Sequence, residues 1–375
     1  MKKIALAAAA LATVTALALT GCSGSGRTAD PSASGDAGAS AGFAADSTIG
    51  VALPDKTSEN WVLAGKLFED GLKEAGFKGD VQYAPASNTV AEQQNQISAM
   101  ITNGAKVIVI GAKDGKQLGT QLQQAADAGV KIIAYDRLIE NTPNVDYYVA
   151  FDNFKVGELQ GQALLDGLAK RSGHAAPWNV ELFSGSPDDA NSAVFFDGAM
   201  KVLQPKIDDG TLKVVSGQTA IAQTATQGWK AENAQSRMDS LLAANYTSAT
   251  IDGVLSPNDT LARAIITSVK QAGKDISTFT VTGQDSEVES VKSIMAGEQY
   301  STINKDTSLL VEQTIKMIGQ LQKGEDVDVN DTEQYNNGVK VVPAYLLKPV
   351  IVTKENAAEA YANNPTLLDI VKAAQ

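Results

Sequence analysis

Side chains with several hydrogen-bonding groups stand directly after the apolar runs of this sequence, where they can reach a common ligand. They are Asn60 with Trp61, Asp136 with Arg137, Asp188 and Asp189 with Asn191, Asn258 with Asp259, and Gln284 with Asp285. Carboxylate, amide and guanidinium groups can each bridge two neighbouring hydroxyls of one molecule. An indole ring can cover the apolar C–H face of such a ligand. The set therefore favours a neutral polyhydroxylated ligand.

Other chemistries are excluded or disfavoured by composition. The chain of 375 residues has one Cys and one His, so it offers no Cys/His zinc site and no intramolecular disulfide, and a catalytic triad would depend on His174. Asp326, Asp328 and Asn330 begin like a calcium loop, but the glycine and the closing glutamate are missing. We therefore expect no metal, no cofactor and no catalytic residue. The formal charge of −12 argues against a nucleic-acid partner.

The elements that must position these side chains alternate between short apolar runs and amphipathic segments. Strands are predicted over 49–53, 81–84, 107–110, 131–135, 147–151, 179–184, 212–216, 252–256, 278–282, near 299–303 and near 339–352. Helices are predicted over 60–75, 89–103, 115–128, 153–171, 191–203, 230–244, 260–272, and near 286–296, 306–323 and 356–362. Continuously apolar strands indicate parallel sheets with helices on both faces. Ligands of such sheets bind beyond the carboxyl ends of the strands, where the polar residues stand.

Several of these residues also have a purely structural interpretation. Trp61 fits an i, i+3, i+7 series with Ala64 and Phe68, so core packing competes with ligand stacking. Asp259 precedes Thr260 at a helix start, where capping alone would explain either residue. Trp229 lies off the apolar stripe of its helix, which favours a ligand role. Asp136 and Arg137 could pair with each other, but charged residues directly after a buried strand more often line a cleft.

The first 46 residues are not part of the predicted fold. Residues 1–21 have two lysines followed by a short apolar stretch, which is typical of a secretory signal peptide rather than a membrane span. The run Leu19-Thr20-Gly21-Cys22 resembles a bacterial lipobox, which implies lipidation of Cys22; ordinary secretion with a chance cysteine is the alternative. Residues 22–46 are rich in Ser, Gly and Ala and predict a flexible tether.

Long strings of the sequence resemble the ChvE-type multiple-monosaccharide-binding proteins and the related xylose-binding proteins. The strings are residues 133–139, the run Ala150-Phe151-Asp152-Asn153, and residues 181–189, 283–285, 296–303, 337–343 and 345–347. The resemblance extends from about Ile49 to Asn356. Asn60 stands where xylose-binding relatives carry Arg, and Ala190 replaces the first of a pair of Asn residues. The resemblance therefore does not choose one monosaccharide.

The resemblance implies two Rossmann-like lobes of the type I periplasmic-binding-protein fold, joined by three crossovers with the ligand between them. The crossovers are expected near Asp152, near Gln284 and after Gly324. The first lobe is thus predicted over 47–152 plus 285–325, and the second over 153–284 plus 326–375. By position, the family's ligand contacts fall on Asn60, Trp61, Asp136, Arg137, Asp189, Asn191, Trp229, Asn258, Asp285 and Lys305.

The implied function is an extracytoplasmic, lipid-anchored, monomeric receptor that closes around an aldopyranose and delivers it to the permease of an ABC importer. A receptor whose main role is signalling to a membrane sensor is an open alternative. A secreted glycoside hydrolase would use two of Asp136, Asp189, Asp259 and Asp285, but Arg137 and Lys305 are expected to keep nearby carboxylates ionised, which suits binding. A LacI-type regulator would need a helix-turn-helix before the core, where this chain has the lipobox and tether.

Overall fold

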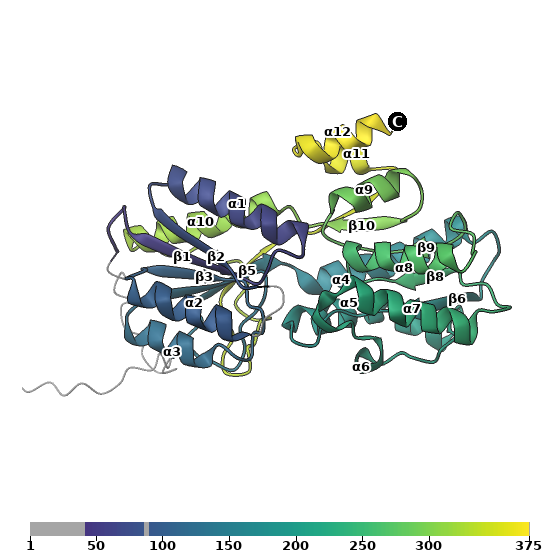
Figure 1. The fold of residues 1–375 in the computed structure, drawn as a ribbon, viewed down its shortest axis with the longest axis horizontal. Helices are drawn as coiled ribbons and strands as arrows, with labels where there is room; N and C mark the ends of the chain where they lie inside the picture. Colours follow the sequence, from purple (N-terminus) through teal and green to yellow (C-terminus); the bar gives the residue numbers. More distant parts are fainter. Residues whose placement is uncertain (1–41, 86–89, 375) are drawn as a thin grey trace, which may run out of the picture.

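The computed structural model describes residues 42–85 and 90–374, which form two α/β lobes side by side (Figure 1). The predicted signal peptide, Cys22 and most of the predicted tether lie outside these residues. Among the described helices, none combines the length and the apolar character needed to cross a membrane.

The first lobe is built on a parallel sheet that has six strands within the described residues, in the order β11-β5-β4-β3-β1-β2. The strands are β1 (Thr48–Leu53), β2 (Lys78–Tyr83), β3 (Val107–Ile110), β4 (Lys131–Tyr135), β5 (Tyr147–Phe151) and β11 (Ala344–Leu347). Helices α1 (Glu59–Glu74) and α10 (Thr307–Lys323) cover one face of the sheet, and α2 (Val90–Thr102) and α3 (Gly119–Asp127) cover the other (Figure 1).

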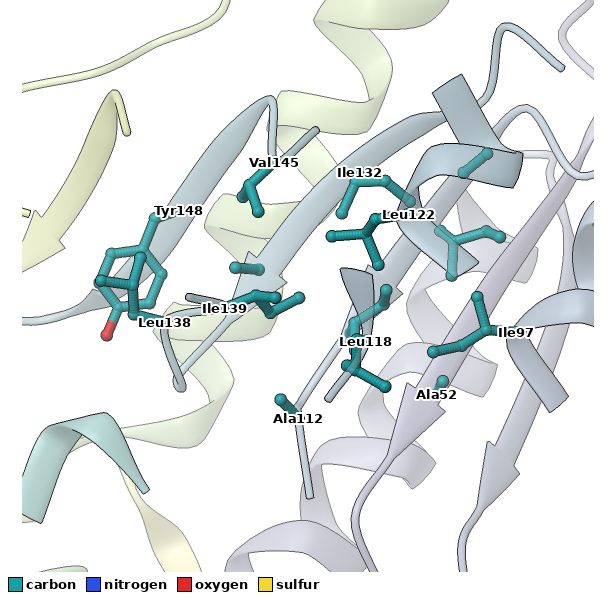
Figure 2. Packing of buried hydrophobic residues seen from close by; sticks show 14 of the residues in the cluster. Ala52, Ile97, Ala112, Leu118, Leu122, Ile132, Leu138, Ile139, Val145 and Tyr148 are labelled. Atoms are coloured by element: carbon teal, nitrogen blue, oxygen red, sulfur yellow. The ribbon is translucent and has the colours of Figure 1, made fainter. Parts of the chain in front are cut away.

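Both faces of this sheet are buried, as the continuously apolar strands predict. On the face covered by α2 and α3, Ile97, Leu118 and Leu122 pack against Ala52 and Ile132 of the strands (Figure 2). Residues of alternate parity along β3 belong to the cluster on the opposite face. Such burial removes apolar side chains from water on both sides, so the carboxyl ends of the strands are held in a fixed row.

The second lobe contains a parallel sheet of four strands in the order β7-β6-β8-β9 within the described part of the chain. Its strands are β6 (Trp178–Leu182), β7 (Leu212–Val214), β8 (Gly253–Leu255) and β9 (Thr280–Val281). Its larger helices are α4 (Asn153–Arg171), α5 (Ala190–Asp208), α7 (Ala231–Asn245) and α8 (Asp259–Gln271), with the short α6 (Ile221–Thr224) and the turn η1 (Gln227–Trp229) before α7. Gly157 and Gly198 allow helices α4 and α5 to pack closely. A side chain at either position would overlap the backbone of the other helix.

An annex continues the second lobe beyond its sheet. It comprises α9 (Val288–Met295), the antiparallel pair β10 (Ser301–Asn304) and β12 (Val350–Thr353), and the C-terminal helices α11 (Ala357–Ala360) and α12 (Pro365–Ala373). A cluster that includes Val291, Val352, Tyr361 and Val371 holds these elements together. Figure 1 shows the annex at the top, above the second sheet.

Three crossovers join the lobes, but two of the expected boundaries are wrong. The chain crosses at residue 152 as expected, then at 305–306 between β10 and α10, and at 348–349 between β11 and β12. Residues 285–304 therefore belong to the second lobe, because β10 pairs with β12 and α9 packs on α8. Residues 326–347 belong to the first lobe, because β11 pairs with β5.

Other element predictions need smaller corrections. The run 339–352 forms two strands in different sheets, α3 begins at Gly119 rather than near 115, and α12 follows α11 where no helix was expected. The last tether residues are attached to the fold: the backbone of Phe43 bonds to Gln322, and its ring lies 6.4 Å from that of Phe77. Phe43 supplies the apolar surface that the rest of the tether sequence lacks.

Candidate functional site

A cavity of about 890 Å³ opens between the lobes at the carboxyl ends of both sheets. All ten residues predicted as ligand contacts line it: Asn60, Trp61, Asp136, Arg137, Asp189, Asn191, Trp229, Asn258, Asp285 and Lys305. They come from loops and helix starts that follow β1, β4, β6, β7, β8, β9 and β10. The size is that of a pocket for a small organic ligand.

The first lobe contributes a carboxylate and a guanidinium directly after β4. Asp136 has a positive φ of 61°, which turns the chain away from the strand immediately after Tyr135. Arg137 Nη1 donates to the carbonyl of Ala112 at 3.1 Å, and its Nε lies 3.2 Å from Asp189 Oδ2 of the second lobe. Arg137 Nε is buried without a hydrogen bond of good geometry, so its contact with Asp189 is an ion pair that joins the two lobes at the cavity.

Lys305 lies on the second crossover and meets carboxylates of both lobes. Its Nζ is 3.0 Å from Asp285 and 4.0 Å from Asp136, and the side chain is 10% exposed. Burial alone would lower the pKa of Lys305, but Asp285 and Asp136 outweigh it, so the pKa is raised above its usual value. Burial also raises the pKa of Asp136, against the opposing influence of Lys305. The cations therefore oppose the rise in the pKa of Asp136 without cancelling it, because desolvation there exceeds their effect.

Two polar residues of the second lobe are both helix caps and cavity residues. Asp189 caps α5 by accepting from the backbone N–H of Asn191, while its Oδ2 is free to accept from Trp229 Nε1 at 3.1 Å. Asn258 caps α8 through Oδ1, which accepts from Leu261 N–H at 2.9 Å. Capping thus fixes one oxygen of each side chain, and both residues also line the cavity.

Two indole rings form apolar walls. Trp61 packs against Tyr135 with ring centroids 6.1 Å apart, and Arg137 lies 5.4 Å from its ring, so it serves both the core and the cavity wall. Trp229 ends the turn η1 with a positive φ of 54°. Gly185 permits its position, since any side chain at 185 would overlap the indole ring. Trp61 therefore packs with the core and also lines the cavity, while its stacking on a ligand stays a prediction.

The lobes are already in contact on both sides of the cavity. Asn191 Nδ2 donates to the carbonyl of Asp136 at 2.8 Å, and its Oδ1 lies 3.2 Å from the hydroxyl of Tyr148. On the other side, Asn60 Nδ2 donates to the carbonyl of Asp285 at 3.4 Å. Asn191 and Asn60 thus each form hydrogen bonds with the other lobe as well as lining the cavity. The sequence did not indicate these bonds.

The cavity also contains residues that the sequence analysis missed. Phe195 lies one turn after Asn191 on α5 and 5.5 Å from Lys305 Nζ, and the i, i+4 spacing from Asn191 was the available signal. The half-buried pair Asp55 and Lys113, 3.4 Å apart, follows β1 and β3. Gln227 and Lys230 lie on the opposite wall. These last residues follow strands too, so the carboxyl-end rule itself would have included them.

Asp259 is fully buried and does not line the cavity. The N-cap of α8 is Asn258 rather than Asp259 or Thr260. Within the described residues, no group of three or more His, Cys, Asp or Glu side chains could hold a metal ion. Among the predicted contacts that line the cavity, three carboxylates are matched by two cations and flanked by indole rings, an arrangement suited to holding a neutral hydroxylated molecule.

Two doubly wound lobes around a polar cavity define a bilobed solute-binding protein. The chain belongs to a family described as "Periplasmic binding protein domain", whose model matches residues 49–326. The expected type I periplasmic-binding-protein fold is thereby confirmed, and members of this family are binding proteins rather than enzymes. The glycoside hydrolase alternative is excluded.

Relatives cover most of the chain. It is 51% identical to the multiple sugar-binding periplasmic receptor ChvE of Rhizobium radiobacter and 35% identical to the D-xylose-binding periplasmic protein of Escherichia coli, in each case over 84% of this chain and 89% of the relative. A solved structure of an ABC transporter solute-binding protein from Clostridium phytofermentans, with bound β-D-glucose, is 40% identical with a TM-score of 0.81. It covers 86% of this chain and 99% of its own.

Proposed function

We propose that this chain is an extracytoplasmic receptor that binds one aldopyranose, such as glucose, galactose, xylose or arabinose, between its lobes. The observation that carries the proposal is the cavity set itself: Asp136, Asp189 and Asp285 with Arg137 and Lys305, between two indole rings. The relatives named for sugar binding and the glucose-bound neighbour support the ligand class.

The charges at the cavity favour a neutral sugar. Among the predicted contacts, three carboxylates against two cations leave a net charge near −1, so a hydroxyl can donate to a carboxylate and accept from Arg137 or Lys305 at the same time. The indole rings of Trp61 and Trp229 provide apolar area for the C–H faces of a pyranose. An anionic ligand would add a fourth negative charge to this set.

Binding is proposed to act by stabilising the closed arrangement of the lobes. Asp136 and Arg137 belong to the first lobe, Asp189 and Asp285 belong to the second, and Lys305 lies on a crossover. A sugar reaches both sets only when the lobes are together, so its binding energy favours closure. The closed receptor is then recognised by the membrane permease of an ABC importer, which takes the sugar.

The proposed location is the outer face of the cell membrane. Residues 1–21 are proposed to be a signal peptide, and Cys22 the lipidated first residue of the mature chain. Replacement of Cys22 by Ser is expected to move the protein from the membrane fraction to the soluble fraction and to abolish fatty-acid labelling. Retention of the label in the variant would contradict lipidation at Cys22.

Isothermal titration of the mature chain, purified in detergent, tests the ligand. Glucose, galactose, xylose, arabinose and ribose are titrated separately, with mannitol as an open-chain polyol control. Saturable binding of one or more aldopyranoses, and none of mannitol, is expected. Absence of binding to every aldopyranose would refute the proposed ligand class while leaving the fold unchanged.

A further inference from the structure

The segment 283–287, which we call the ligand loop, presents Asp285 to the cavity in a conformation that needs external support. Asp285 and Ser286 are non-glycine residues with positive φ values of 97° and 53°. Such conformations cost free energy and persist only where the surrounding structure fixes them. The loop lies against Lys305 through the Asp285 carboxylate and against Asn60 through the Asp285 carbonyl. What holds this loop therefore decides where Asp285 lies.

The buried carboxylate of Asp259 holds the loop from behind the cavity wall. Its Oδ2 accepts from the backbone N–H of Glu287 at 3.0 Å and from the hydroxyl of Thr302 at 2.9 Å, and its Oδ1 accepts from Gln299 Nε2 at 2.8 Å. The backbone N–H of Asp259 also donates to the carbonyl of Gln284 at 3.1 Å. Its contacts thus reach the loop on both sides of Asp285.

Thr302 extends this support to a second residue of the loop. Its hydroxyl donates its proton to Asp259, so its lone pair is available to accept from Ser286 N–H, at 3.2 Å. The two loop residues after Asp285 are therefore tied to one carboxylate, one directly and one through a hydroxyl. Gly283 completes the fit, because any side chain there would overlap Asp259 Oδ1.

Nothing else in the site uses Asp259. It is 0% exposed, it does not line the cavity, and it does not cap α8, whose N-cap is Asn258. Burial and the nearby Glu287 and Asp285 carboxylates raise its pKa, and the hydrogen bonds from Gln299 and from the Glu287 N–H oppose that rise only in part. A buried acid placed in this way is costly unless its contacts are all made.

We propose that Asp259 is a positioning residue for ligand binding, which holds the ligand loop so that Asp285 faces Lys305 and the sugar. This rests on the proposed function, because the bound sugar is the readout. The alternative is a contribution to stability alone, in which Asp259 supports the second lobe without affecting affinity.

The first experiment compares Asp259→Asn with Asp252→Asn by titration of the preferred aldopyranose. Asp252 is a matched control: it is 2% exposed, it accepts from the N–H of Asn179, and it precedes β8 at the end of the strand remote from the cavity. Both variants lose buried hydrogen bonds, so both are expected to unfold at lower temperature. Only Asp259→Asn is expected to weaken binding, by about tenfold or more. Equal affinities for the two variants would overturn the proposal.

A double-mutant cycle tests whether Asp259 acts through Asp285. In the Asp285→Ala background, Asp259→Asn is expected to change affinity by less than about twofold, because the carboxylate that it positions is gone. The same fold loss in both backgrounds would overturn the proposal. If Asp259→Asn does not fold, Thr302→Val replaces it in the same cycle, with an expected loss of sugar affinity of about threefold. An equal loss in the wild-type and Asp285→Ala backgrounds would again overturn the proposal.

Hydrogen exchange of the sugar-free mature chain separates this proposal from the proposed function. The amides of Ser286 and Glu287 are expected to exchange about tenfold faster in Asp259→Asn, or in Thr302→Val in its place, and to be unchanged in Asp252→Asn. Unchanged exchange in the test variant would overturn the positioning role even if sugar binds. If no aldopyranose binds the wild-type chain, the proposed function fails, while the exchange result still decides whether Asp259 holds the loop.

Discussion

Replacement of Lys305 by Met removes the cation that the two lobes share. In the structure its ammonium is 3.0 Å from Asp285 and 4.0 Å from Asp136, and its side chain is 10% exposed. Methionine has nearly the same length and no charge, so packing against Phe195 can persist while the electrostatic partner is lost. Among the predicted contacts, three carboxylates then remain with Arg137 as the one cation.

The magnitude follows from the type of contact that is lost. A charge-assisted hydrogen bond contributes about 1.5–3 kcal/mol, and an ammonium that faces the cavity donates one to a ligand hydroxyl as well as one to Asp285. The loss on the ligand side alone is about 2–3 kcal/mol once the uncompensated carboxylates are included, which corresponds to a roughly 30- to 150-fold weaker affinity. Unfolding temperature is expected to fall too, because the carboxylates repel one another in the folded state.

The assay is isothermal titration at a temperature where the variant is fully folded, as shown by circular dichroism. Lys66→Met is the matched control, because Lys66 is a highly exposed lysine of the same lobe as Asp136 and pairs with Asp70 one turn away. It is expected to leave affinity unchanged, since exposed pairs of this kind contribute little. If Lys305→Met binds sugar within threefold of the wild type, the assignment of Lys305 as a ligand contact is refuted.

Three further outcomes are expected from the site. Asp136→Ala and Asp285→Ala should each weaken sugar binding by at least about tenfold, measured by titration, and affinity kept within a factor of two would contradict their assignment. Trp229→Phe keeps an aromatic wall but removes the indole N–H that lies 3.1 Å from Asp189, so a loss of roughly three- to tenfold is expected, and an affinity equal to that of the wild type would argue against the hydrogen bond. Because burial raises the pKa of Asp136, affinity should begin to fall at higher pH than for an ordinary aspartate with a pKa of 3.8, as the acceptor becomes protonated. By linkage, the same raised pKa increases the free energy of unfolding as pH falls through it. Acidification should therefore weaken sugar binding and stabilise the fold through the same carboxylate. Both pH dependences should be absent in Asp136→Asn.

The fold class could be predicted because its signals are local. A run such as Val107-Ile108-Val109-Ile110 buries both faces only in a sheet covered by helices, and the structure places it at the centre of the first sheet. The lobe boundaries after residue 284 were wrong because the three strands involved have four residues each, and nothing local determines which sheet they join. Ala344–Leu347 adds to the first sheet and Val350–Thr353 pairs with β10, although two residues separate them.

The ten predicted side chains meet in one cavity because each follows a strand whose carboxyl end faces the other lobe. The rule that ligands bind at the carboxyl ends of parallel strands identifies these polar residues, but it does not say which atoms contact the ligand and which bond to the protein. Asp189 and Asn258 each use one oxygen to cap a helix, and Asn191 donates to the carbonyl of Asp136. Those roles depend on the exact residue at which each helix begins and on contacts between the lobes, and the sequence pattern determines neither.

The double use of these side chains has a consequence for how the receptor can discriminate among sugars. A carboxylate whose second oxygen caps a helix cannot rotate to follow a ligand, so Asp189 presents its Oδ2 in one fixed direction, between Trp229 Nε1 and Arg137. The same holds for Asn258. Its Oδ1 accepts from Leu261 N–H, and this bond also fixes the orientation of the amide nitrogen. Such preorganisation lowers the entropic cost of binding. It also limits the receptor to sugars whose ring hydroxyls lie within reach of these fixed atoms. Tolerance of different sugars must then come from less constrained parts of the cavity, such as Lys230, whose side chain caps no helix.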